Sequence, residues 1–353
     1  MSGFVTGRAG RLTPRRLAIA LAVCVAVTAG CAVIAPLVGI VVDRGSWHLG
    51  VMGRSALDPG SPDHAILWAL RVPRVLAALV AGAALAGAGC ALQSLLRNPL
   101  AEPFTLGISS GASLAAVLAI RLGAEGVFGF AGIGGASLVG AAGTLIVVWR
   151  LARIGTQLPP ATLVLAGITM SMFCSSASTL IQWTSDFTDV THMLQWMMGG
   201  MESVRLVTVG YAALPIGGAL AVLIAYAREL NALAAGPDVA ASLGVEVGRT
   251  QKMLFAISSL LVGAAIAVVG PIGFIGLIVP HALRALLGAD HRLLVPASMF
   301  GGAAVLTVCD TLARTVVPLH HLPTGAVTSV LGVPFFVAIL VGQKQRAALW
   351  GRG

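Results

Sequence analysis

The chain has 353 residues, of which 57% are hydrophobic and only 10% are charged, and its mean hydropathy is +0.94. A soluble domain carries about 25% charged residues, so this chain lacks the charge to cover a water-facing surface of its size. The net charge of +9 does not indicate nucleic-acid binding, because the basic residues fall between apolar segments and form no run interleaved with aromatic residues.

Apolar segments recur along the whole chain at about the 20 residues that a bilayer-crossing helix needs. Glycine is abundant (44 residues) and aromatic residues make up only 5%, which favours a helical bundle with close contacts over a membrane β-barrel. The sequence therefore predicts an all-α membrane protein of about ten transmembrane helices. We expect them near residues 17–42, 70–95, 104–120, 128–149, 160–183, 206–227, 252–271, 273–287, 294–315 and 323–342.

The first apolar segment resembles a signal peptide, because several arginines precede it and "TAGC" ends at Cys31. It continues to Val42, however, which is too long for a signal sequence and suits a retained helix. We expect a cytoplasmic tail (1–16), a single transmembrane domain (17–342) with one main cytoplasmic loop (228–251), and a second cytoplasmic tail (343–353).

The distribution of basic residues predicts the orientation. With ten spans and both termini in the cytoplasm, 15 of the 22 Lys and Arg residues fall inside and seven outside. Cytoplasmic loops of membrane proteins carry this excess of basic residues, so the asymmetry favours cytoplasmic N- and C-termini.

A polar interruption follows the second span. Arg97 and Asn98 come directly after the apolar run, and Pro99 and Pro103 do not continue a helix. The next span begins with closely spaced Gly and Ser residues in "LGISSGASLAAV", which let two helix backbones approach each other. We expect Arg97, Asn98 and Pro99 to form a tight cytoplasmic turn into a closely packed helix.

The sequence lacks the motifs of an ATPase and of the common hydrolases. Neither Lys252 nor Lys344 lies in a phosphate-binding G-x-x-x-x-G-K-[ST] motif, and there is no HExxH or GxSxG. The five cysteines lie in apolar segments without CxxC spacing, which favours buried apolar residues over a disulfide or a metal site. We therefore expect no catalytic residues, no metal ligands and no cofactor bound by this chain.

Asp310 is the one acidic residue well inside a predicted span, and Arg314 follows it at i+4 on the same helix face. The simplest interpretation is a local ion pair near the outer membrane surface. An ion-coupled secondary transporter usually carries acids near the midplane, and the absence of such a set argues against that class. The absence of a paired nucleophile and base argues against an intramembrane enzyme.

Long stretches of the chain resemble the FecCD-type permeases, the transmembrane subunits of importers for ferric siderophores, haem and cobalamin. The resemblance covers about residues 65–342. The matching stretches include "RVPRVLAALVAGAALAGAGCALQSLLRNPLAEPFTLGISSGA", "WMMGG", "LNALAAGPDVAASLGVEVG", "GPIGFIGLIVPHALRALLGADHRLLVPAS", "DTLAR" and "LPTGAVTSVLGVPFF". Family members have ten transmembrane helices, so the resemblance implies the permease bundle of a type II ATP-binding-cassette (ABC) importer in the bacterial cytoplasmic (inner) membrane.

The resemblance also implies the partners. These are two ABC ATPase subunits, which carry the ATP and Mg, a second permease that is either an identical copy or a paralogue, and an extracytoplasmic substrate-binding protein. In similar permeases, arginines that match Arg71, Arg74 and Arg314 pair with acidic residues of the binding protein. The alternative from the residues alone is that these arginines anchor the helix ends at the membrane interface.

The main cytoplasmic loop contains "GPDVAASLG", which predicts a short helix. Pro237 suits its first turn, Asp238 complements the positive helix end, and Gly244 is a plausible stop. The resemblance implies that this helix sits in a cleft of the ATPase. We expect the contacts to be made by Ala240, Ala241, Ser242, Leu243 and Gly244.

In similar permeases the fifth span lines the translocation pathway. Here it carries Thr169, Met172, Ser175 and Ser176, a mildly polar set that suits weak binding of a substrate as it passes.

A ferric siderophore is the expected substrate, followed by haem and cobalamin. His321, after His320, stands where the family usually has Glu, which is either a tolerated surface change or an adaptation to substrate or partner.

Overall fold

The computed structural model describes residues 13–43, 46–124, 130–155, 158–202, 204–317 and 322–350. The longer helices are α1 (Pro14–Leu37), α3 (Val72–Leu95), α4 (Ile108–Arg121), α6 (Phe130–Ala152), α7 (Pro160–Trp183), α9 (Leu206–Ala225), α12 (Val247–Val269), α13 (Ile275–Leu287), α14 (His291–Thr315) and α15 (Thr324–Trp350). The shorter elements are the strands β1 (Val38–Asp43) and β2 (Ser46–Val51), and the helices η1 (Arg54–Leu57), α2 (Pro62–Ala65), η2 (Ile66–Arg71), η3 (Pro103–Leu106), α8 (Phe187–Met197), α10 (Ala227–Ala235) and α11 (Pro237–Ser242).

These helices confirm the predicted membrane-protein fold. Within the described residues, seven helices are long and apolar enough to cross a membrane, and three shorter apolar helices begin at Ile108, Ile275 and Thr324. Together they correspond to the ten predicted spans. The last helix continues to Trp350, past residue 342, where the predicted span ends.

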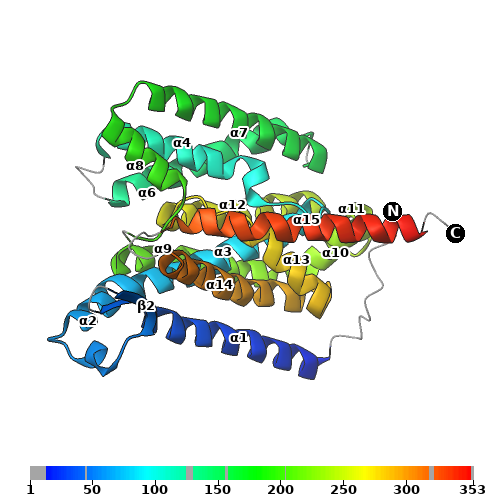
Figure 1. Ribbon diagram of the computed structural model, residues 1–353. Coiled ribbons are helices and arrows are strands. Elements are labelled where there is room, and N and C mark those ends of the chain that lie inside the picture. The colour runs from blue at the N-terminus through cyan, green and yellow to red at the C-terminus, as the bar shows by residue number, and fades with distance from the viewer. Residues whose placement is uncertain are drawn as a thin grey trace.

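The long helices run side by side between two ends of the bundle (Figure 1). Helix α1 begins and α15 ends at the same end, where α10 and α11 also lie, and we call this the α11 end. The antiparallel hairpin β1–β2, with Val38 opposite Val51, lies with α2 and α8 at the other end, which we call the hairpin end. The hairpin and α8 are short elements that hydropathy alone did not predict.

Helix α3 forms the centre of the bundle and packs against α9, α12, α13 and α14. Small residues make this possible: a Cβ atom on Gly82 would overlap the carbonyl oxygen of Gly302 on α14, and one on Gly89 would overlap Gly276 on α13. Close backbone approach of this kind is typical of membrane helices. The apolar window of α3 is 78% buried, whereas that of α1 is not buried at all, so α1 lies at the periphery.

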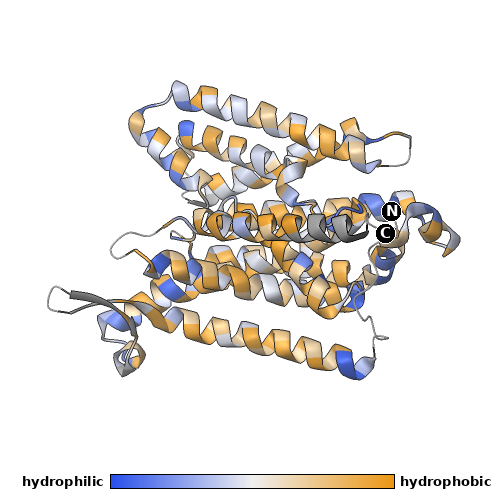
Figure 2. Cartoon of the chain, turned by 45° about the vertical axis from the view of Figure 1, so that its right-hand side comes forward, coloured by the Kyte–Doolittle hydropathy of each residue, from blue (hydrophilic) through white to orange (hydrophobic). Residues whose placement is uncertain are grey.

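Figure 2 shows apolar residues on outward as well as inward faces of the long helices, as expected for a protein whose outer surface contacts lipid. The predicted boundary between the spans 252–271 and 273–287 is also confirmed. Helix α12 ends at Val269, and Gly270 and Phe274 then adopt positive φ angles of 70° and 69° before α13 begins at Ile275.

Candidate translocation, docking and coupling sites

A buried cluster of charged side chains joins four segments at the hairpin end. Nε of Arg74 on α3 lies 2.8 Å from Oδ1 of Asp310, and Nε of Arg314 lies 3.2 Å from Oδ2 of the same carboxylate. The Thr324 hydroxyl at the start of α15 donates to Asp310 Oδ1 at 3.0 Å. Arg314 also donates to the carbonyl oxygen of Ala35 near the end of α1 at 3.1 Å. The predicted i, i+4 ion pair is therefore confirmed, and it belongs to a larger cluster.

The structure corrects the expected position of two of the docking arginines. Arg74 is only 6% exposed and Arg314 only 7% exposed, so both guanidinium groups lie inside the hairpin end rather than on its surface. The reason is that Asp310 supplies a carboxylate within the bundle, and desolvated arginines bind the nearest one available. Nη2 of Arg74 has no hydrogen-bond partner among the described residues.

Arg71 is separate from this cluster and half-buried. Its Nη1 donates to the carbonyl oxygens of Pro36, Leu37 and Val38, at 3.1, 3.4 and 3.3 Å. These three carbonyls come where α1 ends and β1 begins, and the last carbonyls of a helix lack partners within the helix. Arg71 thus closes the junction between the first helix and the hairpin.

The turn at residues 97–99 has the tight geometry that its sequence predicts. Oδ1 of Asn98 accepts a hydrogen bond from the Leu100 amide at 3.0 Å, as in an Asx turn. Arg97 adopts a positive φ of 48°, which is uncommon for a residue with a side chain. Beyond the turn, the Glu102 carboxylate accepts a hydrogen bond from the Phe274 amide, so it caps the start of α13.

Helix α11 is the short helix predicted in the 228–251 loop. It begins at Pro237 and ends in a Schellman motif, in which Gly244 N–H donates to Ala241 O at 2.9 Å and Val245 N–H to Ala240 O at 3.0 Å. Gly244 has a φ of 82°, so it is the predicted stop. Ala241, Ser242 and Gly244 are exposed, and Leu243 is 69% exposed.

Ala240 does not fit the expected contact set. Its side chain is 0% exposed, because it lies on the face of α11 that packs against the rest of the protein. Val239, which sequence reasoning missed, is 44% exposed on the same short helix.

Helix α7 presents the predicted pathway residues on one uncovered face. Thr169, Met172, Ser175 and Ser176 are all exposed in the single chain. The Thr169 hydroxyl donates to the carbonyl of Leu165 within the helix at 2.9 Å, which satisfies the hydroxyl in an apolar environment. The face is weakly polar and carries no charge.

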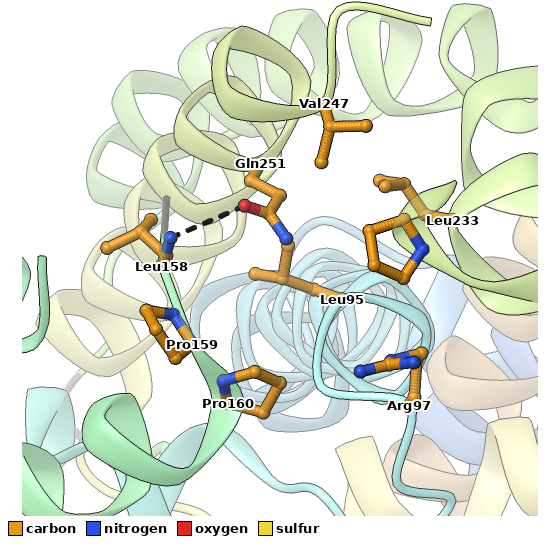
Figure 3. Close-up of a pocket in the computed structure, with 9 residues that line it drawn as sticks. Leu95, Arg97, Leu158, Pro159, Pro160, Leu233, Val247 and Gln251 are labelled. Carbon is orange, nitrogen blue, oxygen red and sulfur yellow. Dashed lines mark hydrogen bonds between the residues drawn. The ribbon is translucent and has the colours of Figure 1, made fainter. Parts of the chain in front are cut away.

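A cavity of about 200 Å³ lies at the α11 end (Figure 3). The lining residues come from the end of α3 (Leu95) and the turn after it (Arg97), from residues 158–160 at the start of α7, from α10 and α11 (Leu233 and Pro237), and from α12 (Gln251). Oε1 of Gln251 accepts a hydrogen bond from the Leu158 amide at 3.5 Å, drawn as a dashed line in Figure 3. The cavity therefore separates α10 and α11 from the start of α7.

Sequence reasoning missed a polar network at the α11 end. Asn231 of α10 donates to Asp290 at 2.9 Å and accepts from the backbone amide of His291 at 2.9 Å. Hydrogen bonds from Arg292, and then from Asn231, lower the pKa of Asp290 to about 2. The only sequence signal for this network is the presence of amide and hydroxyl side chains, including Gln93 and Ser94, in otherwise apolar helices.

No group of three or more potential metal ligands occurs within the described ranges, which leave out 318–321 among others. His320 and His321 lie outside the described residues. The five cysteines are free, and Cys90, Cys174 and Cys309 are buried.

A sequence model described as the FecCD transport family matches residues 31–342 of the chain. The chain belongs to the FecCD transport family. As a FecCD protein it is a permease subunit of an ABC importer and a multi-pass protein of the cytoplasmic membrane, and the family works with ATPase and substrate-binding partners.

Named relatives agree with this assignment. The cobalamin import system permease protein BtuC of Halobacterium salinarum is 36% identical over 341 residues, covering 95% of this chain and 91% of that protein. The hemin transport system permease protein HmuU of Yersinia pestis is 38% identical, covering 78% and 83%. A solved structure of a metal-chelate type ABC transporter in an inward-facing conformation matches with a TM-score of 0.79 and 27% identity, covering 92% of this chain and 99% of that one.

Proposed function

We propose that this FecCD permease moves a ferric-siderophore complex into the cytoplasm by alternating access, driven by separate ATPase subunits. The observation that carries the proposal is the uncovered, uncharged face of α7, with Thr169, Met172, Ser175 and Ser176. A siderophore surrounds its own iron, so a pathway for the complex needs no metal ligands and benefits from weak, dispersed contacts.

The permease works as one of a pair in this proposal. The face of α7 is exposed in the single chain, and hydroxyl groups gain little from facing lipid. A second permease, either an identical copy or a paralogue, would turn this face into one wall of a central pathway.

The α11 end is assigned to the cytoplasm, where two ATPase subunits bind. The excess of basic residues supports this orientation. Helix α11 supports the binding site, because Val239 and Leu243 are exposed apolar side chains on a loop that lies beyond the apolar helices. ATP and Mg belong to the ATPase partners.

The substrate-binding protein docks at the hairpin end in this proposal, near Arg71, Arg74 and Arg314. In this conformation both buried arginines are already bonded to Asp310, so a partner carboxylate would have to compete with Asp310 or bind the unpartnered Nη2 of Arg74. Arg71 is the more accessible of the three, since it is half-buried and, among the described residues, is hydrogen-bonded to backbone carbonyls and not to a carboxylate.

Haem is the alternative cargo, followed by cobalamin, and the hemin and cobalamin permeases among the relatives support keeping both. Uptake of each labelled cargo in a deletion strain separates the three. The strain receives labelled iron as the cell's own ferric siderophore or as haem, or labelled cobalamin, with and without the restored gene.

Loss of ferric-siderophore uptake alone, restored by the gene, is the expected result. Loss of haem or of cobalamin uptake alone would contradict the siderophore and assign the alternative. A restored gene carrying Arg71→Glu tests docking in the same strain: we expect reduced uptake, whereas wild-type uptake would contradict a docking role for Arg71.

A further inference from the structure

A chain of hydrogen bonds crosses from α10 to the central helix α3 at the α11 end. Asn231 of α10 bonds to Asp290 and His291 at the start of α14, and the His291 ring bonds to the Ser94 hydroxyl near the end of α3. His291 is 2% exposed and Ser94 is 4% exposed. The chain is therefore a buried connection between the segment that carries α11 and the centre of the bundle.

The partners assign the direction of each hydrogen bond. The Asp290 carboxylate only accepts, so the Asn231 amide nitrogen faces it at 2.9 Å and the Asn231 oxygen faces His291. Nδ1 of His291 lies 2.7 Å from that oxygen and must carry the proton. In the neutral ring Nε2 accepts, so the Ser94 hydroxyl, whose other acceptor is the Cys90 carbonyl oxygen at 3.1 Å, donates to His291. These hydrogen bonds hold α10, α14 and α3 in one relative arrangement.

A second arm extends the connection to α13. Nε2 of Gln93, which is next to Ser94 on α3, donates to the carbonyl oxygens of Gly276 and Leu277, both at 3.3 Å. Arg284 of α13 donates to Oε1 of the same side chain at 2.9 Å. Gln93 is 3% exposed, so a displacement of the end of α3 is passed directly to α13.

The opposite side of α10 and α11 is less constrained. The cavity of about 200 Å³ separates Leu233 and Pro237 from residues 158–160 (Figure 3). The segment α10–α11 is thus bonded on the side of α3 and α14 and borders open space on the side of α7. A displacement of α11 is therefore transmitted through the hydrogen bonds on the side of α3 and α14.

We propose that Asn231 and His291 form the joint through which movement of α10–α11 reaches α3 and, through Gln93, α13. The inference rests on the proposed function, because the movement originates in the ATPase subunits. Asn231 and His291 are positioning residues in this account: they touch neither the substrate nor the nucleotide.

The test uses the whole importer, with the permease, ATPase and binding protein reconstituted in liposomes that contain ATP. Uptake per ATP hydrolysed is measured for wild type, Asn231→Leu and the control Thr162→Val. Thr162 donates to the carbonyl of Ala152 at 2.9 Å, so the control removes a hydrogen bond between helices at the same end but outside the joint. Radiolabelled ferrichrome, hemin and cyanocobalamin are supplied in parallel, and the one that wild type imports is the probe.

We expect Asn231→Leu to assemble with the ATPase and to hydrolyse ATP, but to import about tenfold less probe per ATP, the order expected when a buried polar group loses its partners. The control should keep the wild-type ratio. The double variant Asn231→Asp with Asp290→Asn exchanges the two side chains while an acceptor still faces His291, and should recover most of the ratio. If Asn231 only stabilised the fold, Asn231→Leu would lower assembly and ATP hydrolysis together and leave the uptake per ATP hydrolysed unchanged.

An unchanged ratio in Asn231→Leu, or no recovery in the double variant, would overturn the joint. Failure of wild type to import any of the three probes would overturn the proposed function instead, so the two failures are distinguishable.

Discussion

Asp310 is the single carboxylate that holds two buried arginines at the hairpin end. Arg74 and Arg314 bond to its two oxygens, and Thr324 adds a third hydrogen bond. Charged groups removed from water are stable only when they are paired. This one side chain therefore connects α3, α14 and the start of α15.

Replacing Asp310 by Asn should lower the free energy of unfolding by about 3–5 kcal/mol, the cost of breaking a buried ion pair by removing one partner. Unfolding in mild detergent, followed with SDS titration, measures the change. Asp189→Asn is the control, because Asp189 pairs with Arg121 at 3.6 Å with both side chains about a third or more exposed, and exposed pairs contribute about 0–1 kcal/mol. Equal effects of the two substitutions would contradict the buried cluster.

Asp290 makes a contribution to stability that depends on pH. Its pKa in the folded protein is about 2, below the value of about 3.9 in an unfolded chain. The contribution is therefore complete above about pH 4 and is lost as the pH falls toward 2. The difference in melting temperature between wild type and Asp290→Asn should be constant from pH 5 to 8 and shrink below about pH 4. A difference that already shrinks between pH 7 and 5 would show that another group is responsible.

Sequence patterns predicted the bond between Asp310 and Arg314 but not the burial of Arg74. Residues at i and i+4 share a helix face whatever surrounds the helix, whereas burial depends on which distant segment covers that face. Ser94, Asn231 and His291 escaped prediction for the same reason: 197 residues separate Ser94 from His291, and no local spacing brings them together.

At the scale of elements, α3 and α14 owe their close contact to Gly82 and Gly302. A Cβ atom on either glycine would overlap the backbone of the other helix. Gly82→Val should therefore separate the helices, and we expect the yield of folded protein in detergent and its melting temperature to fall. Gly143→Val on α6 is the control, because nothing lies within 4 Å of a Cβ atom there. Comparable losses in both variants would mean that side-chain volume itself, rather than the close helix contact, causes the effect.

Helix α11 divides its residues between an exposed and a buried face. Leu243→Glu should weaken binding of the ATPase because it places a charge in an apolar contact, and co-purification of the tagged permease with the ATPase measures this. Asp238→Lys, a charge change on the same short helix, is a comparison for nonspecific electrostatic effects. Normal co-purification of Leu243→Glu would contradict α11 as the ATPase contact.

The long helices followed from the sequence because length and hydropathy are local properties that the bilayer imposes. The turn at Asn98 and the ends of α11 followed from Pro, Gly and Asn residues that act on their own neighbours. The hairpin β1–β2 and α8 did not, because strands of six residues and a helix of 11 residues are shorter than the apolar segments of about 20 residues from which the spans were predicted. The uncovered face of α7 shows only its polarity in the sequence, not its exposure.

At the scale of the whole molecule, the proposed function gives the bundle a partner at each end. The α11 end carries an exposed short helix that is bonded through Asn231 to the central helix, and the hairpin end carries arginines tied to Asp310 and to the end of α1. Between them lies the uncovered face of α7, which we propose as a pathway wall. This arrangement suits a permease that uses energy supplied by a separate ATPase.

The most direct test of that claim is the energy source of uptake in liposomes that contain the complete importer. The account predicts that uptake requires ATP on the side of the ATPase, stops with vanadate, and continues when ionophores remove the proton and sodium gradients. Uptake that proceeds without ATP and follows an imposed proton or sodium gradient would contradict it and identify a secondary transporter.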